Sequence, residues 1–297
     1  MTLSSEMAVN AHRVDFTSKT NGKDYRLFIS VPAGEAPAGG WPVIYLIDAN
    51  LHFGILVDTL RIQACWPETR DAVVVGVGYP TDSVQTALAV RNIDLTPPIS
   101  QDIIDNGWMR GAGMAADHFG GMEAYLQMIE DEAKPLAAKH APLDPNDQML
   151  MGHSLGGLTT LTTMFLHTSR FQTYAAISAS AWFANQWVMG LIDGFAARVR
   201  AGEAKARLFL STGEFEQITP PRPAYPKAGL PISETDWQEM MDDCKMVDLP
   251  TEIAARLEPV KGANFDMRFT VHRDEDHRSV VPAGIAGGVY FGLYRPE

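Results

Sequence analysis

Gln-Met-Leu-Met-Gly-His-Ser-Leu-Gly-Gly, residues 148–157, places a short apolar run before a sharp turn and a second apolar stretch. The turn has the pattern G-x-S-x-G, with Gly152, Ser154 and Gly156 at its fixed positions. Between a strand and a helix this pattern forms a nucleophile elbow, in which a strained backbone lifts the serine hydroxyl clear of the sheet. The glycines let strand and helix approach closely because they lack side chains. The stretch predicts a strand up to residue 152, a helix over 155–168 and a reactive Ser154.

Other apolar runs extend this alternation of strands and helices. Residues 43–48 and the valine-rich residues 71–79 are typical of buried parallel strands. Two alternating stretches flank Asn21-Gly22 near the start of the chain, which predicts an antiparallel hairpin. The remaining predicted elements are strands at 174–178, 207–212 and 267–272 and helices at 53–64, 115–139 and 282–294. An antiparallel start followed by this alternation predicts an α/β fold, with a mostly parallel twisted sheet covered by helices on both faces.

Length and composition fit one globular domain over residues 1–297. The chain is 46% hydrophobic, and no apolar run reaches the roughly 18 residues that a membrane span needs. Residues 1–10 lack the basic and apolar regions of a signal peptide, so we expect a cytoplasmic protein without a membrane partner. The formal net charge of −12 argues against nucleic acid as a partner. Nothing in the composition decides the oligomeric state.

Two stretches fit the regular alternation badly. Residues 80–114 are mixed in character, and residues 217–233 are rich in proline and have no helical period. Long loops in compact α/β domains are uncommon and often functional. Both follow predicted strands, at the sheet edge where open α/β sheets bind ligands, so we expect them to shape a substrate site.

A serine nucleophile needs a base that takes its proton and an acid that orients the base. In α/β-hydrolases these follow in the order serine, acid, histidine. His277 lies in a polar loop before the last predicted helix and is the expected base, whereas His272 ends an alternating strand. Glu214 and Glu216 both follow the predicted strand at 207–212. We favour Glu216 because the acid commonly lies a few residues into the loop, and Glu214 remains the alternative.

The oxyanion of a tetrahedral intermediate needs two preorganised N–H donors. One is expected from the backbone of Leu155, which follows the nucleophile. The other is expected from the loop after the early strand, where the backbone of Ala49 or Asn50 is in place. Asp48 is better read as a structural carboxylate that shapes this loop. Cys65 and Cys244 have no metal-ligand spacing, and this chemistry requires no metal and no cofactor.

Five strings together resemble the esterase family of α/β-hydrolases that contains siderophore esterases of the enterobactin-hydrolase type. Feruloyl esterases and S-formylglutathione hydrolases are more distant relatives. The strings are Trp41-Pro-Val-Ile-Tyr-Leu-Ile-Asp-Ala-Asn50, Val75-Gly-Val-Gly-Tyr-Pro80, Arg91-Asn-Ile-Asp-Leu-Thr-Pro-Pro98, residues 152–157 and Asp276-His-Arg-Ser-Val280. The resemblance runs from about residue 10 to the end of the chain. It implies an α/β-hydrolase fold, Ser154 as nucleophile and His277 as base.

Departures from the family pattern fall near the expected site. Ala49 stands where the family usually has glycine, and residues 178–183 read Ser-Ala-Ser-Ala-Trp-Phe where it often has Ser-Pro-Ser-x-Trp-Trp. Trp182 and Phe183 are candidates for the wall of a substrate pocket, or for a helix packing face. Arg91 is a candidate for binding a substrate oxygen, although an ion pair with Asp94 or another acid is the stronger interpretation.

These observations predict a serine esterase that hydrolyses a small carboxylic ester, such as a siderophore, another lactone or an aryl ester, through an acyl-enzyme. An acyltransferase that uses the same serine and histidine is the alternative. A non-catalytic binding module on a hydrolase fold is disfavoured because Ser154 and His277 are both in place.

Overall fold

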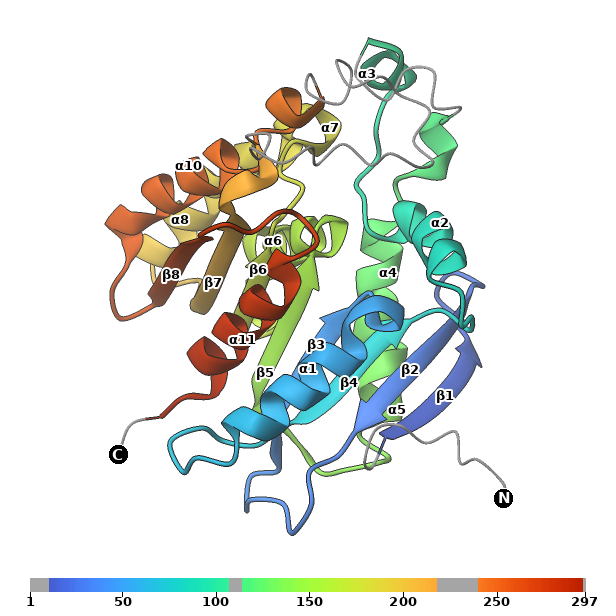
Figure 1. Cartoon of the computed structure of the whole chain (residues 1–297), viewed down its shortest axis with the longest axis vertical. Helices are drawn as coiled ribbons and strands as arrows, with labels where there is room; N and C mark the ends of the chain where they lie inside the picture. Colours follow the sequence, from blue (N-terminus) through green and yellow to red (C-terminus); the bar gives the residue numbers. More distant parts are fainter. Residues whose placement is uncertain (1–10, 107–113, 218–239, 296–297) are drawn as a thin grey trace.

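One eight-stranded sheet forms the centre of the molecule (Figure 1). The computed structural model describes residues 11–106, 114–217 and 240–295. The strand order is β1-β2-β4-β3-β5-β6-β7-β8. β2 pairs antiparallel with β1 and β4, and all other neighbours are parallel. The strands are β1 (Ala11–Thr17), β2 (Asp24–Ser30), β3 (Trp41–Ile47), β4 (Val73–Gly78), β5 (Leu143–His153), β6 (Thr173–Ile177), β7 (Ala206–Gly213) and β8 (Phe265–His272).

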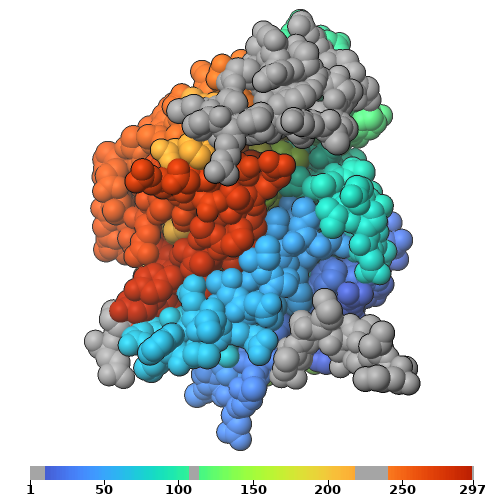
Figure 2. Space-filling view, in the orientation of Figure 1, coloured from blue at the N-terminus to red at the C-terminus, as the bar shows by residue number. Residues whose placement is uncertain are grey.

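Helices cover both faces of this sheet, as an α/β-hydrolase fold requires. Along β3 the side chains of Tyr45 and Ile47 enter one hydrophobic core and those of Ile44 and Leu46 enter the other. The alternation explains why the strand is apolar throughout. α1 (Ala49–Gln63) and α11 (Val280–Leu293) pack together over one face and lie side by side, blue and red, in Figure 2.

The opposite face carries most of the remaining helices. They are α2 (Val84–Asp94), α4 (Met122–Met128), α5 (Lys134–Ala137), α6 (Leu155–Leu166), α8 (Ile192–Arg200) and α10 (Asp248–Leu257), with α3 (Gln101–Asn106) and α7 (Phe183–Gln186) nearer the carboxyl edge of the sheet. No helix within the described ranges combines the length and the apolar character needed to cross a bilayer.

The structure corrects three details of the predicted elements. Residues 80–114 are not one irregular segment, because α2 and α3 lie within them. Ser83 caps the start of α2, and its hydroxyl accepts a hydrogen bond from the Thr86 amide at 3.2 Å. The helix expected over 115–139 is broken into α4, a π-helical turn over Ile129–Ala133 and α5, since Pro135 cannot donate a backbone hydrogen bond. α8 and α10 were not expected. Residues 218–233 of the second expected loop lie outside the described ranges.

The elbow between β5 and α6 is a tight junction at which glycines are required. A Cβ atom at Gly152 would overlap the carbonyl of Gly156, and one at Gly157 would lie 2.9 Å from Cα of Ala179. Strand, helix and the chain after β6 therefore approach one another at distances that only glycine permits. Ser154 sits between them with φ 61° and ψ −122°, the strained backbone that the motif predicts.

Candidate active site

Ser154 lies at the carboxyl end of β5, where its backbone and side chain contact the chain that follows β6. Its amide donates to the carbonyl of Ile177 at 3.0 Å, and its carbonyl accepts from the amide of Ser180 at 3.1 Å. The two serine hydroxyls, Ser154 Oγ and Ser180 Oγ, are 3.4 Å apart. Ser154 is partly exposed, whereas Ser180 is buried. The elbow thus presents one accessible hydroxyl above the sheet.

Glu216 is the glutamate that faces the predicted base. It ends the short turn Glu214–Glu216 after β7, is 1% exposed, and its Oε2 lies 2.6 Å from Nδ1 of His277. Its Oε1 accepts from the Gly213 amide at 2.6 Å and from Ser178 Oγ at 2.5 Å. Glu214 lies elsewhere, accepting from the amide of Asp274 at 3.0 Å. Between the two acids left open by the sequence, the geometry favours Glu216.

The loop between β8 and α11 holds His277. In that loop the Asp276 carboxylate accepts from the amides of Arg278 and Ser279 at 2.8 and 2.9 Å. Burial acts to raise the pKa of Asp276, but hydrogen bonds from Ser279 and Arg278 outweigh it and lower that pKa. The turn therefore stays closed around a carboxylate. With Nδ1 bound to Glu216, His277 has Nε2 left to exchange a proton with a hydroxyl.

Two further histidines pack beneath His277. The ring of His153 lies 4.5 Å from that of His277 and 5.4 Å from that of His52. His153 Nε2 donates to the backbone carbonyl of His277 at 2.9 Å, which fastens the base loop to the residue before the nucleophile. Burial lowers the pKa of both His52 and His153, so both rings stay neutral near pH 7. No cluster of metal-ligating side chains occurs within the described residues.

The predicted oxyanion donors lie at the starts of two neighbouring helices. Leu155 is the first residue of α6 and Ala49 the first of α1, and helix-starting amides have no acceptor within their own helix. β3 and β5 are adjacent strands, and a Cβ atom at Gly156 would lie 3.3 Å from Oδ2 of Asp48. The first turns of α6 and α1 are therefore neighbours. The Asn50 side chain is engaged with the backbone of Tyr79 and Thr81, at 2.8–2.9 Å. Only its backbone amide remains a candidate donor.

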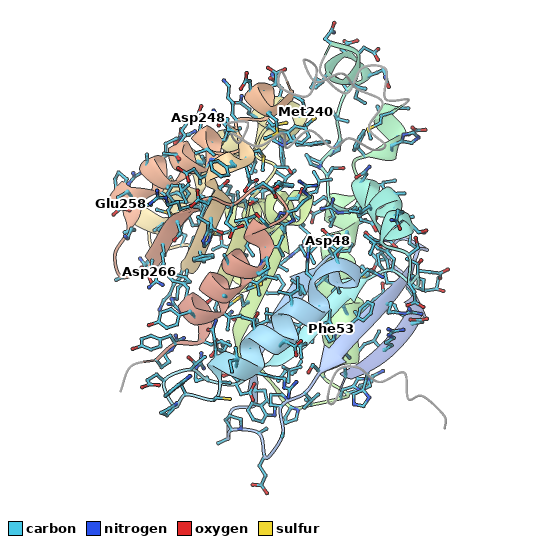
Figure 3. The ribbon with its side chains drawn as sticks, in the orientation of Figure 1. Asp48, Phe53, Met240, Asp248, Glu258 and Asp266 are labelled. Carbon is cyan, nitrogen blue, oxygen red and sulfur yellow. The ribbon has the colours of Figure 1, made fainter. Side chains whose placement is uncertain are left out.

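Asp48 is a structural carboxylate, and Arg91 is its partner. Asp48 adopts a left-handed backbone, with φ 60°, at the junction of β3 and α1 (Figure 3). Its Oδ2 lies 2.8 Å from Nη2 of Arg91, and both residues are buried. Asp94, the acid first considered for Arg91, instead accepts from Lys23 at 2.5 Å and Tyr25 at 3.0 Å. For Arg91 the geometry favours the ion pair, which anchors the loop after β3, over a substrate-binding role.

Replacing Arg91 by Met is expected to lower the free energy of unfolding by about 3–5 kcal/mol, because it leaves the buried Asp48 carboxylate unpaired. Urea unfolding followed by circular dichroism measures the change. The matched control is Arg13→Ala, which breaks the exposed Arg13–Asp82 pair and is expected to cost less than about 1 kcal/mol. Adding Asp48→Asn to Arg91→Met should recover part of the loss. Equal effects of the two arginine substitutions would contradict this role.

The aromatic residues proposed for the pocket wall have different environments. Phe183 is 2% exposed and packs against Phe119, with ring centroids 5.3 Å apart, so it belongs to the core. Trp182 is half-buried and lies against Phe183, which leaves it as the candidate for the wall. A pocket-wall role for Phe183 is therefore not supported, and its ring packs against that of Trp182.

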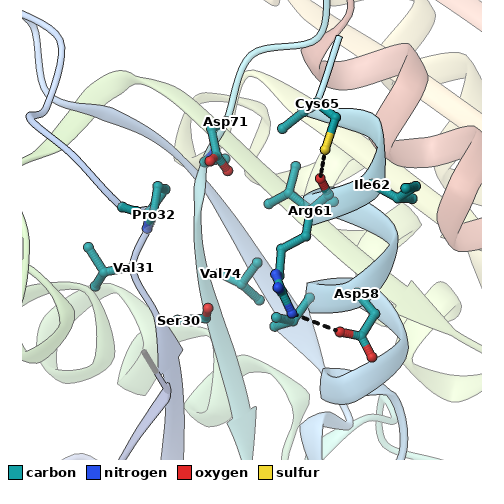
Figure 4. Close-up of a pocket in the computed structure, with 14 residues that line it drawn as sticks. Ser30, Val31, Pro32, Asp58, Arg61, Ile62, Cys65, Asp71 and Val74 are labelled. Carbon is teal, nitrogen blue, oxygen red and sulfur yellow. Dashed lines mark hydrogen bonds and ion pairs between the residues drawn. The ribbon is translucent and has the colours of Figure 1, made fainter. Parts of the chain in front are cut away.

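A cavity of about 540 Å³ lies at the opposite edge of the sheet and does not belong to this site (Figure 4). Ser30 at the end of β2, Asp71 before β4, and Arg61 and Cys65 near the end of α1 contribute to its lining. Burial raises the pKa of Asp71. Since β2 runs antiparallel to β4, these groups sit at the amino edge of the parallel strands, away from Ser154.

Comparison of the sequence with models of known protein families assigns the chain to an esterase family. A family model described as "Esterase: Putative esterase" matches residues 18–219. Ferri-bacillibactin esterase BesA of Bacillus subtilis is 29% identical over 94% of this chain and 88% of its own length. Siderophore enterobactin esterase of Emericella nidulans is 29% identical over 90% of this chain and 88% of its own length.

Solved structures resemble the whole chain. The BES protein from Bacillus cereus superposes with a TM-score of 0.80 at 27% identity, covering 99% of this chain and 100% of that one. The siderophore hydrolase EstA from Aspergillus nidulans superposes with a TM-score of 0.78 at 26% identity, covering 98% and 97%.

Proposed function

Since the chain belongs to the esterase family of α/β-hydrolases, we propose that it hydrolyses siderophore esters through an acyl-enzyme formed on Ser154. That it is a carboxylic ester hydrolase of the serine type follows from the family and from its relatives. The acyl-enzyme, the residues in each role and the substrate are the proposal.

In this mechanism Ser154 Oγ attacks the ester carbonyl carbon, and His277 Nε2 takes the hydroxyl proton. Glu216 holds Nδ1 and stabilises the imidazolium, while the amides of Leu155 and of Ala49 or Asn50 donate to the oxyanion. Collapse of the intermediate breaks the bond to the alcohol, which leaves with the proton from His277. Water then attacks the acyl-enzyme by the same steps and releases the acid and free Ser154.

One observation carries the proposal: the hydrogen bond of 2.6 Å between the buried Glu216 carboxylate and Nδ1 of His277. A carboxylate and an imidazole so arranged form the acid–base half of a serine triad. The bond from His153 to the carbonyl of His277 keeps that pair beside the elbow. Among the residues that the structure describes, Nε2 of His272 has no hydrogen-bond partner, which supports His277 as the base.

Relatives named for siderophore ester hydrolysis support a siderophore as the substrate. The net charge of −12 bears on its type. A ferric tri-catecholate is strongly anionic and is repelled at long range by such a protein, whereas a neutral ferric hydroxamate ester is not. We therefore infer that a neutral chelate is the better substrate.

The test compares kcat/KM for a ferric tri-catecholate lactone, a neutral ferric hydroxamate ester and p-nitrophenyl butyrate, each at low and high salt. The hydroxamate ester should react fastest, and only the tri-catecholate rate should rise with salt, because salt screens repulsion. Equal rates that do not respond to salt would overturn the charge argument. If neither siderophore ester were hydrolysed while p-nitrophenyl butyrate was turned over rapidly, the proposed substrate class would be wrong.

Repeating the assay with added alcohol addresses the acyltransferase alternative. A hydrolase releases mainly the free acid, because water reaches the acyl-enzyme. Transfer of most acyl groups to the alcohol at millimolar concentration would instead identify an acyltransferase.

A further inference from the structure

Ser178 is a buried hydroxyl with an unusual backbone, directly after β6. It is 0% exposed and has φ 46°, a left-handed conformation that is uncommon for a residue other than glycine. Its amide donates to the carbonyl of Ser211 at 2.7 Å, which fixes it against the end of β7. Backbone strain of this kind persists where the surrounding structure holds it in place. Here the strained position aims a side chain at Glu216.

The Ser178 hydroxyl makes the shortest contact on Oε1 of Glu216, at 2.5 Å. A serine hydroxyl has one proton to donate, and the carboxylate is the acceptor beside it. Thr212 Oγ1 also lies near Oε1, at 3.2 Å. Its hydroxyl has a single proton, however, which it donates to the carbonyl of Met246 over the shorter distance of 2.7 Å. The Gly213 amide supplies the other short donor, at 2.6 Å. Ser178 is therefore the side chain that anchors this end of the acid.

Anchoring one oxygen of Glu216 determines where the other lies. With Oε1 held by Ser178 and Gly213, the carboxylate plane is fixed and Oε2 stays 2.6 Å from Nδ1 of His277. We propose that Ser178 is a positioning residue, which acts through Glu216 to hold the orientation and tautomer of His277. This inference rests on the proposed triad. Residues 178–180 also include Ser180, whose hydroxyl lies beside that of Ser154. This short stretch after β6 therefore contacts both the acid and the nucleophile of the proposed triad.

The experiment compares full-length Ser178→Gly and Ser178→Ala with wild type. Glycine tolerates φ 46° without strain, so Ser178→Gly removes the hydroxyl from a backbone that still folds. The matched control is Ser211→Ala, which deletes an equally buried hydroxyl that has no partner within the described residues. Steady-state kinetics on p-nitrophenyl butyrate and the downfield proton NMR resonance of the His277 Nδ1–H bond are measured for each.

We expect kcat to fall about tenfold to a hundredfold in both Ser178 variants with KM within about twofold, because the lost bond matters for the base and not for substrate binding. The downfield resonance should shift or broaden in both, and Ser211→Ala should match wild type. A folded Ser178→Gly with wild-type kcat and an unchanged resonance overturns the inference. If the Ser178 variants gave that result and Ser154→Ala were inactive, the inference about Ser178 would fail but the proposed function would stand. If Ser154→Ala remained active, the proposed triad would itself be wrong.

Discussion

Ser154→Ala is expected to lower kcat by about 10⁶-fold, because no other group in a serine triad can form the acyl-enzyme. The structure makes the experiment sharper than a simple knockout, since a second hydroxyl, that of Ser180, lies 3.4 Å away. Only Ser154 has the strained elbow backbone and the start of α6 directly behind it. Hydrolysis of p-nitrophenyl butyrate measures the loss.

The control for that experiment is Ser180→Ala. A fluorophosphonate reagent should label wild type and Ser180→Ala at Ser154 and should not label Ser154→Ala, as mass spectrometry of the tryptic peptide will show. Labelling that persists in Ser154→Ala and disappears in Ser180→Ala would identify Ser180 as the nucleophile and contradict the assignment of Ser154. Since Ser180 is buried and Ser154 is partly exposed, we expect the first result.

The parts of the site that the sequence predicts are those whose position follows from local rules. Ser154 is placed by the spacing of glycines between a strand and a helix, and the structure has that strand, turn and helix. His277 is placed by its loop before the last helix. The fold class follows from the antiparallel start and the later alternation, and it is confirmed.

Contacts between distant segments are what sequence reasoning missed. The sequence indicated an ion pair of Arg91 with Asp94 or another acid, and the structure has Asp48 as that acid. This choice depends on where the end of β3 meets α2 in space. Ser178 reaches Glu216 from a different strand, and no spacing in the chain signals that contact. Ser178 itself matches the first serine of the family pattern, and the departures within residues 178–183 fall at Ala179 and Phe183. Side-chain partners of this kind follow from packing, which periodicity does not encode.

Glu216→Gln is expected to lower kcat by about 10⁴-fold, and the reason lies in the direction of each hydrogen bond. Oε1 of Glu216 accepts from Gly213 and Ser178, and Oε2 faces Nδ1–H of His277. A glutamine has only one oxygen to accept with. If that oxygen keeps Gly213 and Ser178, its amide nitrogen faces Nδ1, and His277 must carry its proton on Nε2, where it cannot take one from Ser154.

Glu214→Gln is the matched control, two residues away on the same turn. Glu214 accepts from the exposed amide of Asp274, and a glutamine oxygen can do the same, so kcat should stay within about threefold of wild type. Kinetics on p-nitrophenyl butyrate, with urea unfolding to verify that both variants fold, gives the comparison. A larger loss in Glu214→Gln than in Glu216→Gln would transfer the acid to Glu214. Equal activity of both variants would mean that His277 needs no acid, because the hydrogen bond of 2.6 Å would then have no part in orienting the base.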